Sequence, residues 1–271
     1  MNPIIVYCGT TPNIGTTLVS FTSAWLAAER SGWNIAYLCL NLKSSKLHRY
    51  MKRDNAEQTL DHLTPALKAR TLSAEGLRSF GCRMPELPKL WFLFGNRERE
   101  QAELYTPDDI QLLLELTSSH FDLTFVEVNA YWDNAATVCA LQQAQQRYMV
   151  TTPNLTHFQE DFGCWYGKLS SWLQLAGDPL QLIVTQWHPK GAAYPLGKIE
   201  KETGLTIAGS IPWLADVDER LNAGELIRMT SGNRTLRKAV EPIAMQILRS
   251  SGYEPEATAQ ASWIRRLLLS S

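Results

Sequence analysis

An apolar strand that runs through a glycine turn into an apolar helix is the feature that most constrains the fold of this chain. Residues 4–20 read IIVYCGTTPNIGTTLVS, and the helical pattern continues to Leu26. In a strand–loop–helix of this kind, the backbone N–H groups of the loop and the positive end of the helix dipole point to the same place, which suits a phosphate group. The segment therefore predicts an α/β fold that begins with a phosphate-binding type of strand–loop–helix.

The loop keeps the turn but has lost the groups that act on a nucleotide. A working loop carries glycines, a lysine that reaches the terminal phosphates and a Ser or Thr hydroxyl that binds Mg²⁺. Gly15 and Thr17 hold the last glycine and hydroxyl positions, whereas Thr16 stands in place of the lysine. Pro12 and Asn13 stand where glycines are needed, and Pro12 removes a backbone N–H. What remains predicts a weakened anion site.

The blocks that follow the loop resemble the ParA/MinD branch of P-loop ATPases. That branch is marked by a loop of the form K-G-G-x-G-K-[ST]-[ST] and by a next strand that ends in D-x-D. Aligned on Gly15, the first family lysine falls on Thr11 and the second on the residue after the glycine. The two aspartates fall on Cys39 and Asn41, and the Mg²⁺-side aspartate of a later block (FDLTFVE) falls on Glu127.

Two blocks in the second half of the chain extend the resemblance over roughly residues 3–250. Residues 147–159 (RYMVTTPNLTHFQ) are similar to a family strand and turn, and residues 181–227 are similar to the block that lines the base in relatives. There Gln186 takes the place of the adenine-contacting asparagine, and Pro212 lies at the start of the base-lining loop. The resemblance thus implies a vestigial nucleotide site formed by Gly15, Thr16, Thr17, Glu127, Gln186 and Pro212.

Strand and helix patterns alternate, which favours one α/β domain over residues 1–250. The expected architecture is a mostly parallel twisted sheet of about seven strands with helices on both faces, the P-loop NTPase fold. Residues 106–109 (TPDD) are typical of a helix start, with a hydroxyl cap, a proline and two carboxylates. The expected strands are Ile4–Cys8, Ile35–Leu40, Leu90–Phe94, Leu123–Glu127, Tyr148–Thr152, Leu182–Gln186 and Ile207–Ile211.

Composition narrows the function classes. The chain has 271 residues, 45% of them apolar, and a formal net charge of −1, which gives no general attraction to nucleic acid. Its five cysteines are scattered without a C-x-x-C pair, which fits a reducing cytosol and speaks against a metal site. The sequence begins with a strand, without a signal-peptide pattern, and no apolar run approaches the roughly 18–20 residues that span a bilayer. We therefore expect a cytoplasmic protein.

Residues 43–89 are the segment least like the family. They are rich in Lys and Arg, with acidic residues interspersed. The corresponding stretch in relatives holds the partner and dimer surface, while a solvated helical insert explains the same composition without any partner.

The C-terminal tail, residues 251–271, is a linker-like stretch followed by ASWIRRLLLSS. On a helix its apolar residues share one face and its arginines lie beside that face. This pattern is typical of an anchor at the inner face of the plasma membrane, and MinD-like relatives carry such a helix. A terminal helix that docks on the core or on a partner fits equally well. The residues concerned are Trp263, Ile264, Arg265, Arg266, Leu267 and Leu268.

Tryptophans suggest two further surfaces. Trp132 and Trp213 flank the positions that surround the nucleotide in relatives, so we expect aromatic bulk to fill the vacated pocket or to turn it into a binding surface. Trp165 and Trp172 have helical spacing, which is typical of a core-facing helix or, if they are exposed, of a partner surface.

Because two lysines and two carboxylates are replaced together, the sequence predicts a pseudo-ATPase rather than an enzyme. We expect no cofactor, with binding of ATP and Mg²⁺ without hydrolysis left open. The threonine in place of the second lysine resembles the TadZ/CpaE group, which places Tad-type pilus machinery. The expected role is a localisation factor or scaffold for a bacterial membrane-associated machine, such as a pilus, secretion or division apparatus, with protein partners and a homodimer left open. The alternatives are a divergent ATPase with nucleotide-controlled dimerisation and a DNA-partitioning protein.

Overall fold

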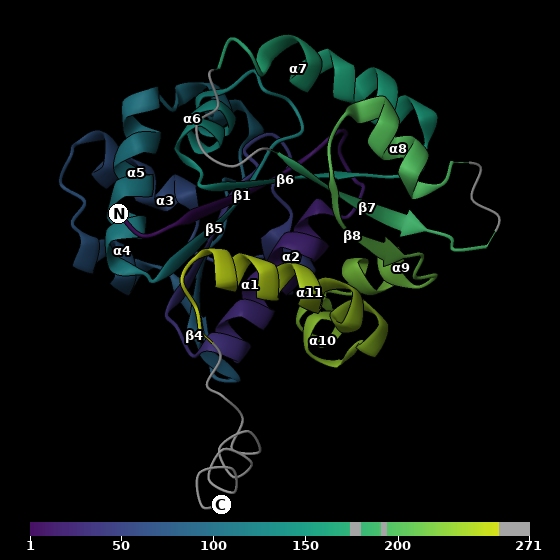
Figure 1. Ribbon diagram of the computed structural model, residues 1–271. Coiled ribbons are helices and arrows are strands. Elements are labelled where there is room, and N and C mark those ends of the chain that lie inside the picture. Colours follow the sequence, from purple (N-terminus) through teal and green to yellow (C-terminus); the bar gives the residue numbers. More distant parts are fainter. Residues whose placement is uncertain (174–179, 191–193, 255–271) are drawn as a thin grey trace, which may run out of the picture.

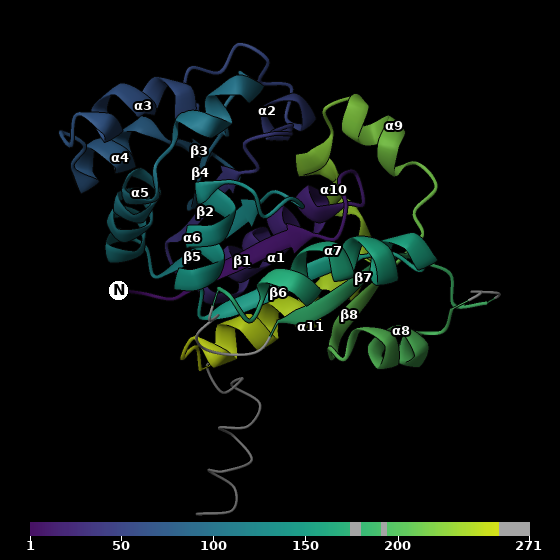
Figure 2. The same cartoon turned by 90° about the horizontal axis from the view of Figure 1, so that it is seen from above.

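The chain folds around one eight-stranded sheet that lies between two layers of helices (Figures 1 and 2). The computed structural model describes residues 1–173, 180–190 and 194–254. The strand order is β3-β4-β2-β5-β1-β6-β7-β8, and all neighbours are parallel except β3 with β4. The strands are β1 (Ile4–Gly9), β2 (Ile35–Leu40), β3 (Cys82–Met84), β4 (Leu87–Leu93), β5 (Leu123–Val128), β6 (Gln146–Thr151), β7 (Gln181–Trp187) and β8 (Ile207–Pro212).

Helices cover both faces of the sheet, and each face has its own apolar cluster. One face packs against α1 (Thr16–Ser31), α2 (Leu47–Tyr50), α9 (Val217–Asn222), α10 (Leu226–Gly232) and α11 (Arg234–Ser250). The other face packs against α3 (Leu60–Lys68), α4 (Ala74–Phe80), α5 (Pro107–His120), α6 (Ala135–Gln143), α7 (Phe162–Leu169) and α8 (Leu196–Thr203). A 3₁₀ helix (Arg99–Leu104) precedes α5, and a π-helical turn (Thr156–Asp161) precedes α7.

The seven expected strands are all present. The apolar runs of the six inner strands are buried on both faces of the sheet, whereas the edge strand β8 is mostly half-buried. In β1, for example, all six residues are buried. The expected number of strands is one too low, since β3 was not predicted. It has only three residues, Cys-Arg-Met, without an apolar run, and it pairs antiparallel at the sheet edge. Its approach requires Gly81, where a Cβ atom would lie 2.0 Å from the Trp91 ring.

The expected helix start at residues 106–109 is confirmed as a capping box. The Thr106 side chain accepts from the Asp109 N–H at 3.3 Å, and the Asp109 carboxylate accepts from the Thr106 N–H at 2.9 Å. Lys68 donates to the same carboxylate at 3.1 Å, which ties α3 to the start of α5.

Replacing this cap tests its contribution to stability. We expect Thr106→Ala to lower the free energy of unfolding by about 1 kcal/mol, because the first turn of α5 loses a side-chain partner for an N–H group. Urea unfolding measures the change. Ser119→Ala, at the exposed end of the same helix, is the control and is expected to change stability by less than about 0.5 kcal/mol. Equal losses in both variants would contradict the prediction.

Candidate functional site

The glycine loop lies at the carboxyl edge of the sheet, between β1 and α1. β1 is a central strand, with β5 on one side and β6 on the other. The carboxyl ends of parallel strands are where open α/β sheets bind ligands, so the loop is in the expected position for a site.

The backbone of the loop keeps a glycine-type path although glycines have been replaced. Asn13 has φ 62° and Gly15 has φ 92°, both in the left-handed region. Asparagine tolerates this region better than most side chains do, which explains how Asn13 stands at a glycine position. Thr185 supports the loop from β7, since its hydroxyl donates to the Ile14 carbonyl at 2.7 Å. This hydrogen bond ties the loop to β7.

Thr16, in the place of the lysine, turns back onto the loop. Its hydroxyl oxygen lies 2.9 Å from the point where a Cβ atom on Gly9 would stand. Neither its length nor its charge allows it to reach across the loop as a lysine does. Nothing in this side chain can neutralise a phosphate.

Glu127 on β5 is the centre of the site. Its carboxylate accepts from the Thr17 hydroxyl at 2.6 Å and from the Tyr37 hydroxyl at 2.8 Å. The Asn41 amide donates to it at 3.3 Å, and the Cys39 thiol lies 3.8 Å away. Glu127 is 1% exposed. The hydrogen bonds therefore join α1, β2 and β5 through one buried carboxylate.

The Glu127 carboxyl group is surrounded by neutral hydrogen-bond donors. Burial raises the pKa of its carboxyl group, while hydrogen bonds, that from Thr17 first, oppose the rise. Burial and the nearby Glu127 also raise the pKa of Cys39 to about 12. Lys43, two residues beyond Asn41, does not supply the missing cation, since its ammonium group is bound to Asp133 at 2.7 Å and to Glu103 at 3.2 Å.

A row of asparagines lies directly beyond Glu127 at the carboxyl edge. Asn41 and Asn129 come directly after Leu40 and Val128, which are paired between β2 and β5. Asn96 comes three residues after the end of β4, and continuing the β2–β4 register pairs it with Asn41. One amide atom of each asparagine is buried without a hydrogen-bond partner, and such atoms are commonly satisfied by bound water. Sequence analysis missed this row. Its signal was an asparagine within three residues of the end of each of three neighbouring strands.

The two residues expected on the base side, Gln186 and Pro212, lie apart from Glu127. They occupy the carboxyl ends of β7 and β8, with β6 between these strands and β1. Gln186 is exposed and has φ 53°, in the left-handed region. Next to it the ring of Trp213, which is 49% exposed, stacks on His188 at 5.5 Å. The structure thus brings Gly15, Thr16, Thr17 and Glu127 together and places Gln186 and Pro212 farther along the same edge of the sheet.

The two tryptophan expectations have mixed outcomes. Trp132 is 3% exposed and packs edge-on against Tyr166 in the cluster on the face opposite α1, so it does not fill a nucleotide pocket. Trp213 remains available as an exposed surface. Trp165 packs partly on the core, whereas Trp172 is 83% exposed, so the core-facing interpretation is wrong for Trp172.

The fold that carries this site is the fold of ParA and MinD ATPases. A ParA family ATPase from Chlorobium tepidum TLS matches with a TM-score of 0.78 at 18% identity, covering 90% of this chain and 99% of that one. MinD in the MinC:MinD cell division complex of Aquifex aeolicus matches with a TM-score of 0.72 at 16% identity (91% and 96% covered). A plasmid partition protein from Borrelia burgdorferi B31 bound to AMPPNP matches with 0.72 at 13% identity (92% and 100% covered). Neither a protein-family model nor a curated protein matches the sequence.

The raised pKa of Glu127 predicts a pH-dependent stability. Between the usual value of 4.5 and the raised value, the native state binds a proton that the unfolded state has lost. The wild-type free energy of unfolding therefore falls, relative to that of Glu127→Gln, as the pH rises through this window, and the difference is constant above it. Urea unfolding from pH 4 to 8 measures the difference. A difference that rises with pH would contradict this account.

Glu127→Ala is the matched variant at the same position. It leaves the donors of Thr17, Tyr37 and Asn41 without their acceptor, so we expect a loss of about 1–3 kcal/mol at pH 7. Glu127→Gln keeps an acceptor oxygen and is expected to lose less.

Proposed function

We propose that this protein is a catalytically degenerate member of the ParA/MinD fold class, acting as a localisation factor or scaffold for a membrane-associated bacterial machine. The observation that carries the proposal is the lysine position of the loop, where the Thr16 hydroxyl stands and turns back toward Gly9. Thr17 and Glu127, the hydroxyl and carboxyl groups on the Mg²⁺ side of a working site, are joined by a hydrogen bond of 2.6 Å. That bond leaves lone pairs on the hydroxyl oxygen, so the proposal rests on the missing cation rather than on this contact.

The residues around the loop fit a nucleotide with Mg²⁺ poorly. An incoming triphosphate would meet the Thr16 hydroxyl in place of a lysine. Lys43, the cation near the end of β2, is already held by two carboxylates. Phosphoryl transfer depends on positioning and on neutralising charge, and the second requirement is unmet.

The exposed aromatic residues support a role in binding proteins. Trp172 is 83% exposed and Tyr131 is 40% exposed, and the Tyr131 ring lies 6.1 Å from that of Trp165. Tryptophan and tyrosine side chains are enriched at protein–protein interfaces. Residues 43–89 add exposed cations such as Arg49 and Arg53. The Aquifex aeolicus MinD, which has the same fold, is itself found in a complex with MinC.

The membrane role rests on the tail. No helix in the described ranges is both long and apolar enough to cross a bilayer. The anchor residues Trp263, Ile264, Arg265, Arg266, Leu267 and Leu268 lie outside the described residues, and the proposal relies on their sequence pattern. Among the candidate machines, the loop threonine favours a pilus, as in the TadZ/CpaE group. A secretion apparatus and a division apparatus are the other candidates.

One observation favours the alternative of a divergent ATPase with nucleotide-controlled dimerisation. The loop backbone keeps its left-handed residues at positions 13 and 15, so the N–H groups have not lost the geometry of a phosphate cradle. Binding of nucleotide decides between the two functions. The near-neutral charge still speaks against DNA partitioning.

Calorimetric titration with ATP and Mg²⁺ tests the degenerate site. We expect no saturable heat with the full-length protein up to millimolar ATP, because the loop has no lysine and Pro12 removes one of its backbone N–H groups. The Borrelia burgdorferi partition protein, which binds AMPPNP, is the positive control under the same buffer. Binding at micromolar ATP would contradict the proposal and make the divergent ATPase the better function.

Flotation with lipid vesicles tests the anchor. The full-length protein is expected to float with vesicles rich in anionic lipid and to do so about tenfold less with neutral ones. Trp263→Ala/Leu267→Ala is expected to lose binding, since these side chains enter the acyl boundary. Trp172→Ala is the control, because it removes an exposed tryptophan that lies outside the tail. This variant is expected to float like wild type. Equal flotation of all variants would exclude the tail as the anchor.

A further inference from the structure

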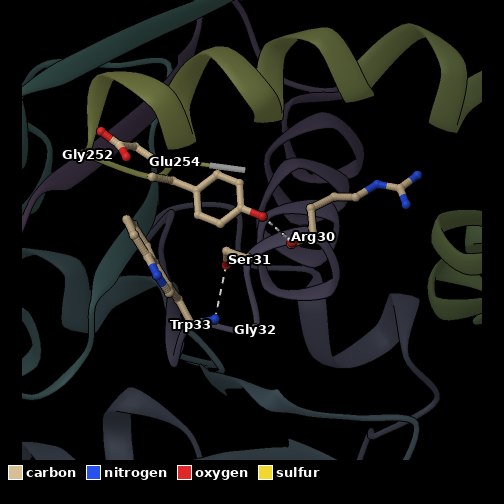
Figure 3. A pocket seen from close by; sticks show the side chains of 7 residues that line it. Arg30, Ser31, Gly32, Trp33, Gly252 and Glu254 are labelled. Carbon is tan, nitrogen blue, oxygen red and sulfur yellow. Dashed lines mark hydrogen bonds between the residues drawn. The ribbon is translucent and has the colours of Figure 1, made fainter. Parts of the chain in front are cut away.

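A pocket of about 550 Å³ lies at the edge of the molecule opposite the glycine loop, where α1 and α11 both end. Residues 30–33 and 252–254 line it, and Figure 3 shows their side chains around the opening. Neither the resemblance nor the candidate site accounts for this pocket.

Two glycines and two aromatic rings form the pocket. Gly32 (φ 67°) ends α1 and Gly252 (φ 91°) follows α11, each in the left-handed conformation that closes a helix. The Tyr253 hydroxyl donates to the Arg30 carbonyl at 2.9 Å, and the rings of Trp33 and Tyr253 meet edge to face at 5.7 Å. The two helix ends are thereby tied together around the opening.

The electrostatics of the pocket favour a cation. Two helix C-termini point their negative ends at it, and the exposed Glu254 carboxylate lies at its rim. Arg30 is paired with Glu241 at 2.5 Å, and Arg249, in the last turn of α11, is not part of the lining. Aromatic walls next to a carboxylate suit a guanidinium group, which stacks on rings and pairs with carboxylates.

The chain itself supplies such a group close by. Residues 255–271 continue from Glu254, the last residue of the lining, and they contain Arg265 and Arg266. An extended chain of eleven residues spans up to about 38 Å, which is long enough for a turn that returns Arg265 to the pocket. A tethered group of this kind has an effective concentration of about a millimolar, which compensates for a weak single contact.

We propose that the pocket between the ends of α1 and α11 binds a guanidinium group of the chain's own tail, from Arg265 or Arg266. Docking removes that arginine and the neighbouring Trp263 from the surface that would meet lipid. The tail is then a two-state element, held on the core or released to a partner surface. Docking itself does not depend on whether the tail binds membranes.

Disulfide trapping in the full-length chain tests the contact. The pair Ser31→Cys and Leu267→Cys, in a Cys164→Ser background that removes the exposed native thiol, leaves both arginines in place. We expect an intramolecular disulfide to form at least tenfold faster than with the control pair Ser231→Cys and Leu267→Cys. Adding Arg265→Ala/Arg266→Ala is expected to bring the rate down to that of the control.

Three outcomes would overturn the proposal: equal rates in both pairs, a rate unaffected by the arginine substitutions, or a disulfide that joins two molecules. Far-UV circular dichroism of each variant confirms that it is folded. Glu254→Gln and Trp33→Ala test the pocket from the other side and are expected to slow trapping about threefold or more. If docking occurs, these two variants also float with anionic vesicles several-fold better than wild type. Trapping without any flotation would leave this inference intact and remove the membrane anchor.

Discussion

The buried carboxylate of Glu127 is the interaction on which the site depends. It holds the first turn of α1 through Thr17 and the end of β2 through Tyr37 and Asn41. In a P-loop enzyme these elements are joined by a metal ion and the phosphates of a nucleotide. In this protein hydroxyl and amide donors make the same connection. These hydrogen bonds connect the strands and the helix around the loop, and they require the burial of one acid.

The interior around Glu127 explains why neutral groups collect there. A second carboxylate at position 39 or 41 would face Glu127 across neighbouring strands, in a place that burial already makes unfavourable for charge. Cys39 and Asn41 avoid that repulsion, and the asparagine row extends the neutral polar surface to Asn96 and Asn129. The neutral residues at positions 39 and 41 and the hydrogen bonds to Glu127 are thus two aspects of one local environment.

Local patterns predicted most of the fold, and contacts between distant segments were not predictable. The strands and the capping box at Thr106 depend on residues close in sequence, so their signals were readable. The three-residue β3 depends on Gly81 meeting Trp91, and the asparagine row depends on the register of three strands. Trp132 was placed near a nucleotide from its position in the chain, but the loop turns its ring to the other face of the sheet. The hydrogen bonds of Glu127 could not be inferred from residue identities, since they depend on distances between separate segments.

Helix α1 connects the two ends of the molecule that have been described separately. Its first turn contains Thr17 and its last turn contains Arg30, sixteen residues of helix in all, and the residues between are almost entirely buried. A helix of that length is a rod of about 24 Å, which cannot shorten or bend within a packed core without disturbing its neighbours. A displacement of its first turn must therefore appear as a displacement of its last. The glycine loop sets the position of one end of a rigid helix, and the other end of that helix forms part of the wall of a pocket.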